Sequence, residues 1–179
     1  MTWFNFMSYD LRGQWDSAIW AHNNISDIAP GLDAVWKMGV DPSQVLLGLA
    51  FFGHSFTATN PSCLEPGCPH KGMGTWGECS KSDGILWNNE IDQLIQRHNV
   101  KPKFYKEATV KVATWGDQFV GYDDEETLQM KADYARNKCM GGLMVWSTSQ
   151  DTPDARYNRA VAKIAGRSIS ARSRITGRS

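Results

Sequence analysis

The chain has 179 residues, which is enough for one ordinary domain with a sizeable core and a small second unit. Its 19 Lys and Arg residues balance 19 Asp and Glu residues, and this zero net charge gives no support for binding to nucleic acid or to an acidic membrane. No apolar run approaches the length of a membrane span, so we expect no membrane partner. The 8 tryptophans suit either a core or a surface on which sugars or bases stack.

The stretch 3–10 predicts a buried strand that carries polar groups at its end. Phe4 and Phe6 are apolar, and Tyr9 and Asp10 follow them. In parallel α/β folds, catalytic residues often lie at such strand ends. On this stretch alone, however, we favour a core strand whose Tyr9 and Asp10 only mark where the chain leaves the core. Because this strand follows Met1 at once, we expect no signal peptide within the chain. Because a globular chain seldom begins inside a buried strand, we expect the natural protein to begin upstream.

The next segments predict a strand, a helix and a strand arranged as a βαβ unit. The long loop after Asp10 carries Trp15, which suits either a functional loop or a lid on the core. Residues 32–38 predict a short helix that ends at Gly39. The nearly continuous apolar run 45–52 fits a strand that is buried on both faces, as in a parallel sheet.

Three of the four cysteines crowd into one loop. Residues 57–83 are rich in Gly, Pro, Ser and Cys, and they include Cys63, Cys68 and Cys79, whereas Cys139 lies far away. Such a cluster indicates disulfides in a secreted protein, and we expect at least one among these three cysteines. Zinc is the alternative, because a histidine lies between the last two, but the tight two-residue knuckle is absent. The pairing stays open.

The pattern becomes regular again after this loop. An apolar stripe at helical spacing over 91–95, with Asn88 or Asn89 as its cap, predicts a helix. Residues 110–122 alternate about a Gly-Asp turn and predict a hairpin. Residues 57–122 therefore predict a small α+β unit inserted after the apolar strand.

The last part of the chain predicts a helix, a strand and a helix. The acidic run 124–126 suits a helix start, and the apolar face of that helix would include Cys139 as a buried thiol or a disulfide partner. Residues 143–146 predict a third apolar strand, and 156–165 a further helix. The segment 166–179 is rich in Arg and Ser, and we expect it to be disordered.

Three strand ends, and the order of the segments between them, resemble a glycoside hydrolase family 18 chitinase, and within that family the fungal type related to the killer-toxin chitinase subunit. The resemblance runs over 3–165 and covers only the C-terminal part of the family's domain. Each motif alone is weak, but the combination is specific. The motifs are Met7-Ser8-Tyr9-Asp10, Phe51-Phe52-Gly53-His54, Tyr122-Asp123-Asp124 and Met144-Val145-Trp146.

The resemblance implies an α/β fold, a partial TIM (β/α)8 barrel made of its last three strands, with an inserted small α+β chitinase insertion domain. Residues 3–56 would hold barrel strands six and seven. Residues 57–122 would be the insertion domain, which deepens one wall of the substrate cleft. Residues 123–165 would hold the last helices and strand eight, and 166–179 a disordered basic tail.

The resemblance also implies an activity. Members of the family cleave β-1,4-linked N-acetylglucosamine polymers with retention: a glutamic acid protonates the glycosidic oxygen, and the substrate's own acetamido carbonyl is the nucleophile. The expected partners are chitin or N-acetylglucosamine oligomers, with no nucleic acid and no membrane, and the chain needs the missing N-terminal half of the barrel. No cofactor or metal is expected, and the parent protein is expected to be secreted.

The resemblance assigns roles to five residues of this chain. Tyr9 matches the tyrosine that donates a hydrogen bond to the acetamido oxygen, and Asp10 matches the aspartate that contacts the sugar at and beyond the cleavage point. Met7 matches a residue that packs against the N-acetyl pocket. Trp146 matches the tryptophan on the floor of the subsite whose sugar is distorted, and Trp15 would line the adjoining subsites.

Two departures from the family's pattern bear on function. Many members have Tyr-Gly-Arg after the seventh strand, where this chain has Phe52 and His54 around a glycine. Phe52 lacks a hydroxyl and His54 lacks the constant charge of arginine, so we expect altered or pH-dependent substrate affinity. The motif Asp-x-x-Asp-x-Asp-x-Glu, which ends in the acid, is absent, and only Asp151-Thr152-Pro153-Asp154 begins in the same way.

Two functions stay open. Either the chain is the C-terminal part of a chitinase whose acid lies upstream, or it is a module that binds chitin without cutting it. We favour the first, because three strands cannot close a barrel of about eight strands. Their open edges invite aggregation. We therefore expect the isolated chain to fold poorly and to lack chitinase activity.

Overall fold

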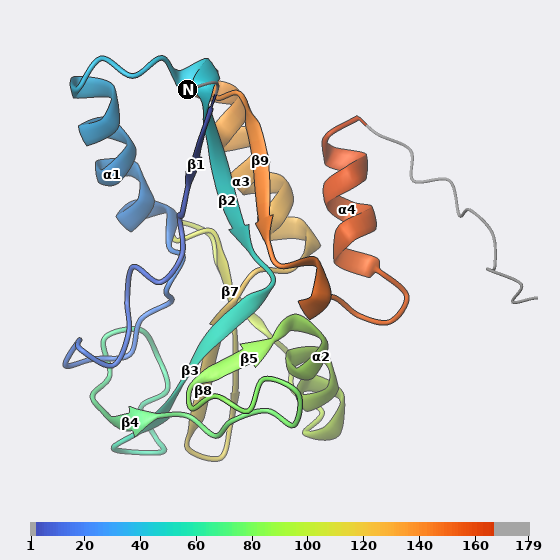
Figure 1. Cartoon of the computed structure of the whole chain (residues 1–179). Helices are drawn as coiled ribbons and strands as arrows, with labels where there is room; N and C mark the ends of the chain where they lie inside the picture. The colour runs from blue at the N-terminus through green and yellow to red at the C-terminus, as the bar shows by residue number, and fades with distance from the viewer. Residues whose placement is uncertain (1–2, 167–179) are drawn as a thin grey trace, which may run out of the picture.

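The computed structural model describes residues 3–166, which form two sheets (Figure 1). The first sheet has three strands in the order β1-β2-β9, and both neighbouring pairs are parallel. The carboxyl ends of the three strands therefore meet at one edge, as the predicted βαβ arrangement requires. The strands are β1 (Phe4–Phe6), β2 (Val45–Ala50) and β9 (Gly142–Trp146).

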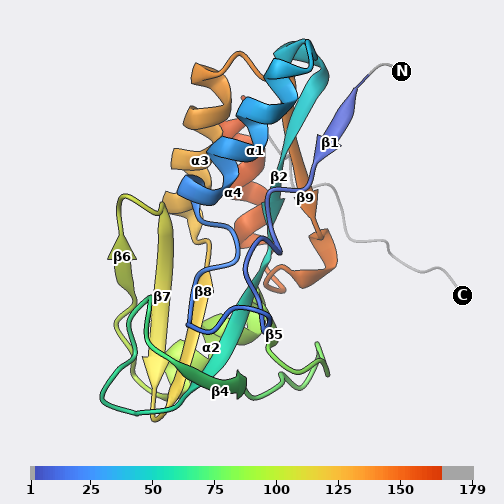
Figure 2. The same ribbon diagram turned by 90° about the vertical axis from the view of Figure 1, so that its left-hand side faces the viewer.

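Three helices cover one side of this sheet (Figure 2). Their apolar faces and β2 share one buried core, to which Leu32, Leu47 and Tyr157 contribute fully buried side chains. The segments predicted at 124–126 and 156–165 do form helices. The helices are α1 (Ile25–Lys37), α3 (Glu125–Asn137) and α4 (Arg156–Ile164), and short 3₁₀ turns lie at Pro42–Gln44 and Thr148–Gln150.

The first helix is longer than its sequence pattern predicts. It begins at Ile25 rather than at 32, because the Asn24 side chain accepts a hydrogen bond from the Ser26 N–H at 2.8 Å and caps the helix. Pro30 lies inside the helix, at an exposed position. The end at Gly39 is confirmed, since this residue adopts a positive φ of 78° just after the helix.

The second sheet is antiparallel and has six strands, in the order β4-β3-β8-β7-β6, with β5 paired to β3. The predicted hairpin is confirmed as β7 and β8. The apolar run 45–52 does not form a single strand: at Phe51 the chain leaves the first sheet, and Phe52 begins β3 in the second. The strands are β3 (Phe52–Ala58), β4 (His70–Met73), β5 (Ile85–Trp87), β6 (Lys103–Tyr105), β7 (Val110–Trp115) and β8 (Gln118–Tyr122).

Helix α2 (Asn88–Arg97) packs Ile91, Leu94 and Ile95 on the second sheet, as the stripe predicts. The prediction of its cap is wrong. Asn88 and Asn89 lie inside the first turn, and Trp87 occupies the cap position. The Glu90 carboxylate accepts a hydrogen bond from the Trp87 N–H at 2.8 Å, so a side chain three residues later satisfies this backbone group.

Strand β1 is less buried than its apolar sequence predicts. The Phe4 side chain is 40% exposed and that of Met7 is 67% exposed. Within the described residues, β1 pairs with β2 alone, so its other edge has no neighbouring strand. Strand β1 thus has the apolar composition that is typical of a buried central strand, but it lies at the exposed edge of the sheet.

The cysteines follow the predicted pattern in part. Cys63 and Cys68 form a disulfide, which confirms the expected bridge in the loop and removes both from any zinc site, whereas Cys79 is a free, exposed thiol. The expectation for Cys139 is wrong, because this residue is exposed and free. It lies beyond the last turn of α3 and adopts a positive φ of 54°, which turns it off the buried face of the helix.

Two further expectations concern the ends of the chain and the membrane. Nearly all of the basic segment 166–179 lies outside the described residues, so its expected disorder stays a prediction. No described helix has both the length and the apolar character that crossing a membrane requires.

Candidate functional site

A pocket of about 400 Å³ lies where the three parallel strands end and the second sheet begins. Asp10 follows β1, His54 lies near the start of β3, and Trp146 ends β9. Five of the seven predicted catalytic and binding residues line this one pocket, although they lie far apart in the chain. The lining residues are Asp10, Trp15, Phe52, His54, Ile85, Trp146 and Gln150.

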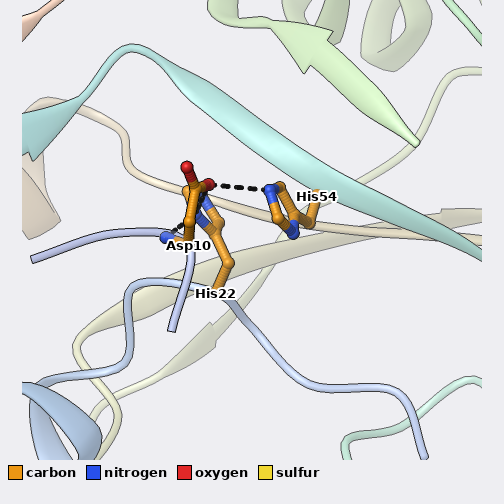
Figure 3. A group of neighbouring side chains, drawn as sticks. All are labelled: Asp10, His22 and His54. Carbon is orange, nitrogen blue, oxygen red and sulfur yellow. Dashed lines mark hydrogen bonds and ion pairs between the residues drawn. The ribbon is translucent and has the colours of Figure 1, made fainter. Parts of the chain in front are cut away.

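The Asp10 carboxylate is the charged centre of the pocket. Its Oδ1 lies 2.9 Å from Nε2 of His54, toward which it points in Figure 3. Partial burial acts to raise the pKa of Asp10, but the adjacent His54 imidazole outweighs it and holds that pKa well below its usual range. Asp10 is therefore ionised at neutral pH and accepts hydrogen bonds rather than donating protons.

His22 is a member of this group that the sequence pattern did not select. Its ring is fully buried and stacks on that of His54, with centroids 4.3 Å apart and planes 9° from parallel. Burial lowers the pKa of His22 to about 4, against a smaller opposing effect of Asp10. In the sequence it is one polar residue in a long loop, and no local pattern distinguishes it from its neighbours.

Tyr9 lies beneath the pocket rather than in its wall. Its ring is buried and meets Phe52 edge-on, with centroids 5.7 Å apart. Its hydroxyl has no hydrogen-bond partner among the described residues, which is unusual for a buried polar group. Burial, with a smaller contribution from the Asp10 charge, raises the pKa of Tyr9. The phenol therefore keeps its proton and can donate a hydrogen bond to an oxygen that reaches it.

Two indoles offer exposed surface at the pocket. The Trp146 side chain is 55% exposed and that of Trp15 is 66% exposed. Flat apolar surfaces of this kind suit the C–H faces of sugar rings. Met7 is also exposed but is not among the residues that line the pocket, so its role at the N-acetyl group stays a prediction.

The cluster of Asp10, His22 and His54 places three possible metal ligands within 4.8 Å of one another. Both ring nitrogens of His22 already bind backbone groups, at 3.1 Å each. That leaves one imidazole and one carboxylate, fewer than the three or four protein ligands typical of zinc sites. The arrangement favours an ion pair over a metal site.

No second carboxylate at the pocket could take the place of the missing acid, within the part of the chain that the structure describes. Asp10 is the only carboxylate among the described residues that line the pocket. Asp151, which begins the partial match to the motif, instead caps α4 by accepting the backbone N–H groups of Tyr157 and Asn158 at 3.0 and 2.7 Å. Asp151, in the segment 151–154 that partly resembles the motif, therefore caps a helix and does not serve as the proton donor.

A larger hollow, of about 680 Å³, lies between α3, α4 and the start of β9, at the opposite end of that strand from Trp146. Most of the residues that line it are of apolar types, and its only charged side chain among the described residues is Arg136. It lacks the combination of aromatic faces and paired charges found at the strand ends, so we place the functional site at the smaller pocket.

The chain is similar to known proteins over most of its length. The sequence model of the glycosyl hydrolases family 18 matches residues 1–151. Human chitinase-3-like protein 2 is 28% identical over 166 residues, which cover 84% of this chain and 42% of that protein. Sheep oviduct-specific glycoprotein is 30% identical over 159 residues, which cover 84% of this chain and 29% of that protein.

The fold comparison agrees with the sequence comparison. The crystal structure of a plant class V chitinase mutant from Cycas revoluta, in complex with (GlcNAc)3, matches with a TM-score of 0.83 at 28% identity. The match covers 93% of this chain and 47% of that one. The chain thus spans less than half the length of these proteins, and its three parallel strands with their helices are part of a TIM barrel. Because the family's sequence model matches most of its residues, the chain belongs to family 18 of the glycosyl hydrolases.

Proposed function

We propose that this chain is the C-terminal part of a chitinase of the fungal, killer-toxin-subunit-like type, and that its pocket binds β-1,4-linked N-acetylglucosamine polymers. The observation that carries the proposal is the pocket itself, in which an ionised Asp10 lies between exposed indoles at the carboxyl ends of parallel strands. The order of the family motifs along the chain supports the type. The chitinase from Cycas revoluta that the chain resembles binds (GlcNAc)3.

Each residue has a proposed task in substrate-assisted, retaining hydrolysis. Tyr9 donates its unpartnered hydroxyl to the acetamido oxygen, which holds that oxygen for attack on the anomeric carbon. Asp10 accepts hydrogen bonds from the sugar. Trp146 stacks on the ring that is distorted, and Trp15 on a neighbouring sugar. Tyr9 and Asp10 thus act on the reacting sugar, and the indoles bind and orient the chain of sugars.

The protonation of the leaving oxygen has to come from outside this chain. The pKa of Asp10 is held low, so this carboxylate carries no proton to give at neutral pH. The acid motif is absent from the sequence. We propose that a segment with the first part of the barrel supplies the glutamic acid and closes the cleft, and that the 179-residue chain is inactive alone.

The second sheet has a proposed part in the cleft. We propose that residues 57–122 form an insertion domain that extends one wall of the pocket. In the sequence, this domain follows barrel strands six and seven, in 3–56, and precedes strand eight, in 123–165. Ile85 of β5 and His54 of β3 already line the pocket from this sheet. The Cys63–Cys68 disulfide in this unit supports the proposal that the parent protein is secreted.

A second function is a module that binds chitin without cutting it. The exposed faces of Trp15 and Trp146 favour this alternative, because they bind sugar with no need for an acid. The two functions differ in what the natural protein contains, and under both of them we expect the folded chain to bind N-acetylglucosamine polymers without hydrolysing them.

The test measures binding and turnover on the soluble, folded fraction of the 179-residue chain, because the open strand edges favour aggregation of the rest. We expect isothermal calorimetry to show binding of the N-acetylglucosamine tetramer and much weaker binding of the glucose tetramer, which has the same linkage but no acetamido group. We expect no release of shorter oligomers from the N-acetylglucosamine tetramer. Turnover by the pure chain would overturn its assignment as an inactive part, and equal affinity for the two tetramers would overturn the acetamido-specific site. Reading the natural transcript upstream for the acid motif then separates the two functions.

A further inference from the structure

We infer that His22 is a positioning residue that holds the Asp10 carboxylate and the His54 imidazole in the arrangement that meets the sugar. This inference rests on the proposed function, since the sugar is the ligand that Asp10 would contact. His22 itself does not line the pocket, and its ring is fully buried behind it. It therefore acts through its neighbours.

The first contribution of His22 is to the backbone of Asp10. The Asp10 N–H donates to Nδ1 of His22 at 3.1 Å, and the next N–H, of Leu11, donates to the His22 carbonyl at 2.9 Å. Asp10 adopts a φ of 58°, in the left-handed region that non-glycine residues seldom occupy. One residue thus satisfies the N–H groups at Asp10 and just after it, and so holds the turn that aims the carboxylate.

The second contribution links two parts of the fold. Nε2 of His22 lies 3.1 Å from the carbonyl oxygen of Phe52, at the start of β3. A backbone N–H only donates and a carbonyl only accepts, so these two partners require the neutral ring with its proton on Nε2. In this form His22 joins the end of β1 to the beginning of the second sheet, and no other tautomer satisfies both bonds.

The third contribution is to the ring of His54. The two imidazoles stack in parallel at 4.3 Å, which sets the plane of His54 and brings its Nε2 to the Asp10 carboxylate. The charged groups that face His22 are Asp10, His54 and the Lys131 ammonium. A neutral His22 places no second charge against the contact between His54 and Asp10. Burial, which lowers the pKa of His22 to about 4, agrees with this neutral form.

The loop that carries His22 is itself anchored. The neighbouring Asn23 donates its side-chain amide to Oδ2 of Asp123 at 2.7 Å, and Asp123 is held by Lys131 in a buried ion pair. The position of His22 is thus set by α3 and the end of β8, independently of the pocket. This is what a positioning residue requires, because its location must not depend on the groups that it holds.

The experiment compares the full chain with His22→Leu and His22→Asn. The leucine variant removes both ring hydrogen bonds, and the asparagine variant keeps an acceptor near Nδ1 for the Asp10 N–H but loses the reach to Phe52 and the stacked ring. We expect affinity for the N-acetylglucosamine tetramer to fall about tenfold in His22→Leu, the equivalent of ~1.4 kcal/mol, and to fall less in His22→Asn. The matched control is His70→Leu, which removes a ring that also binds a backbone carbonyl, at 2.8 Å, but lies outside the pocket; it should bind like the native chain.

A spectroscopic readout tests the same inference without the sugar. Nitrogen NMR of the imidazoles should show His22 as the neutral ring protonated on Nε2 from about pH 5 to 8. A charged ring at pH 7, or a proton on Nδ1, would overturn the inference even if His22→Leu fails to fold. Native-like affinity in both His22 variants would overturn it as well. Failure of the native chain to bind the tetramer would instead count against the proposed function, and the tautomer would still decide the role of His22.

Discussion

Nζ of Lys131 lies 2.6 Å from Oδ2 of Asp123, in an ion pair whose two side chains are almost completely buried. Asp123 follows β8, and Lys131 lies on α3, so the pair ties the second sheet to the helices of the first. The Asn88 side chain of α2 also donates to the carbonyl of Asp123, at 3.1 Å. Three segments that the sequence keeps apart are thus joined at one residue, Asp123.

Breaking this pair from one side should destabilise the chain strongly. Lys131→Met leaves the Asp123 carboxylate buried without its cation, and we expect the free energy of unfolding to fall by about 3–5 kcal/mol. Urea unfolding followed by tryptophan fluorescence measures it. The control is Lys71→Met, because the Lys71–Asp117 pair is much more exposed and should contribute at most about 1 kcal/mol. Equal losses in the two variants would contradict the prediction.

The stability of the chain should depend on pH through His22. Its pKa is about 4 in the folded chain and ~6.5 when unfolded, so between these values the unfolded state binds more protons. The free energy of unfolding should therefore fall as the pH drops from about 6.5 to 4, by at most roughly 3 kcal/mol. The pKa of Asp10 is depressed, so its own contribution is lost only below about pH 4 and does not overlap.

Urea unfolding at a series of pH values checks this dependence. In His22→Asn the titrating ring is gone, and we expect the slope between pH 4 and 6.5 to flatten. A native chain whose stability stays constant over this range would show that His22 is not held neutral by burial. An unchanged slope in the variant would assign the dependence to other groups.

Trp146 should be the main anchor for the sugar. We expect Trp146→Ala to weaken binding of the N-acetylglucosamine tetramer by about thirtyfold, because the loss of an aromatic anchor costs ~2 kcal/mol or more. Calorimetry measures the change. Trp76→Ala is the matched control: Trp76 is equally exposed, at 55%, but does not line the pocket, so its loss should leave the affinity unchanged. A similar loss in both variants would place the sugar elsewhere.

His54 should help to hold the Asp10 carboxylate toward the sugar, because its Nε2 lies 2.9 Å from Oδ1 of Asp10. We expect His54→Leu to weaken binding of the N-acetylglucosamine tetramer by about tenfold, since a hydrogen bond to a charged group contributes roughly 1.5 kcal/mol or more. His54→Arg keeps donors for the carboxylate and should bind more tightly than His54→Leu. Calorimetry measures both variants.

The control for this substitution is His98→Leu, which changes an exposed histidine that stacks on Trp115 outside the pocket. It should bind the tetramer like the native chain. If His54→Leu also binds like the native chain, the contact between His54 and Asp10 has no part in binding.

Much of the fold could be predicted from local patterns. The apolar runs gave β2 and β9 their positions, the acidic turn marked the start of α3, and the alternation about the Gly-Asp turn marked the hairpin of β7 and β8. These elements are encoded by residues close in sequence, whose periodicity matches the structure that they form. Where a local signal was ambiguous, as at the start of the first helix or at the break between Ala50 and Phe52, the prediction failed.

The sequence alone determined which strand ends carry Tyr9, Asp10, His54 and Trp146, because an apolar run followed by polar residues is a local feature. Only the tertiary structure decided what surrounds them. The bonds of His22 to Asp10 and Phe52, and the contact of Asn23 with Asp123, join residues 12 to 100 positions apart. Such contacts depend on how the two sheets pack together, and this packing cannot be predicted from a local sequence pattern. The neutral form of His22 arises in the same way, since burial and backbone partners exist only once the chain has folded.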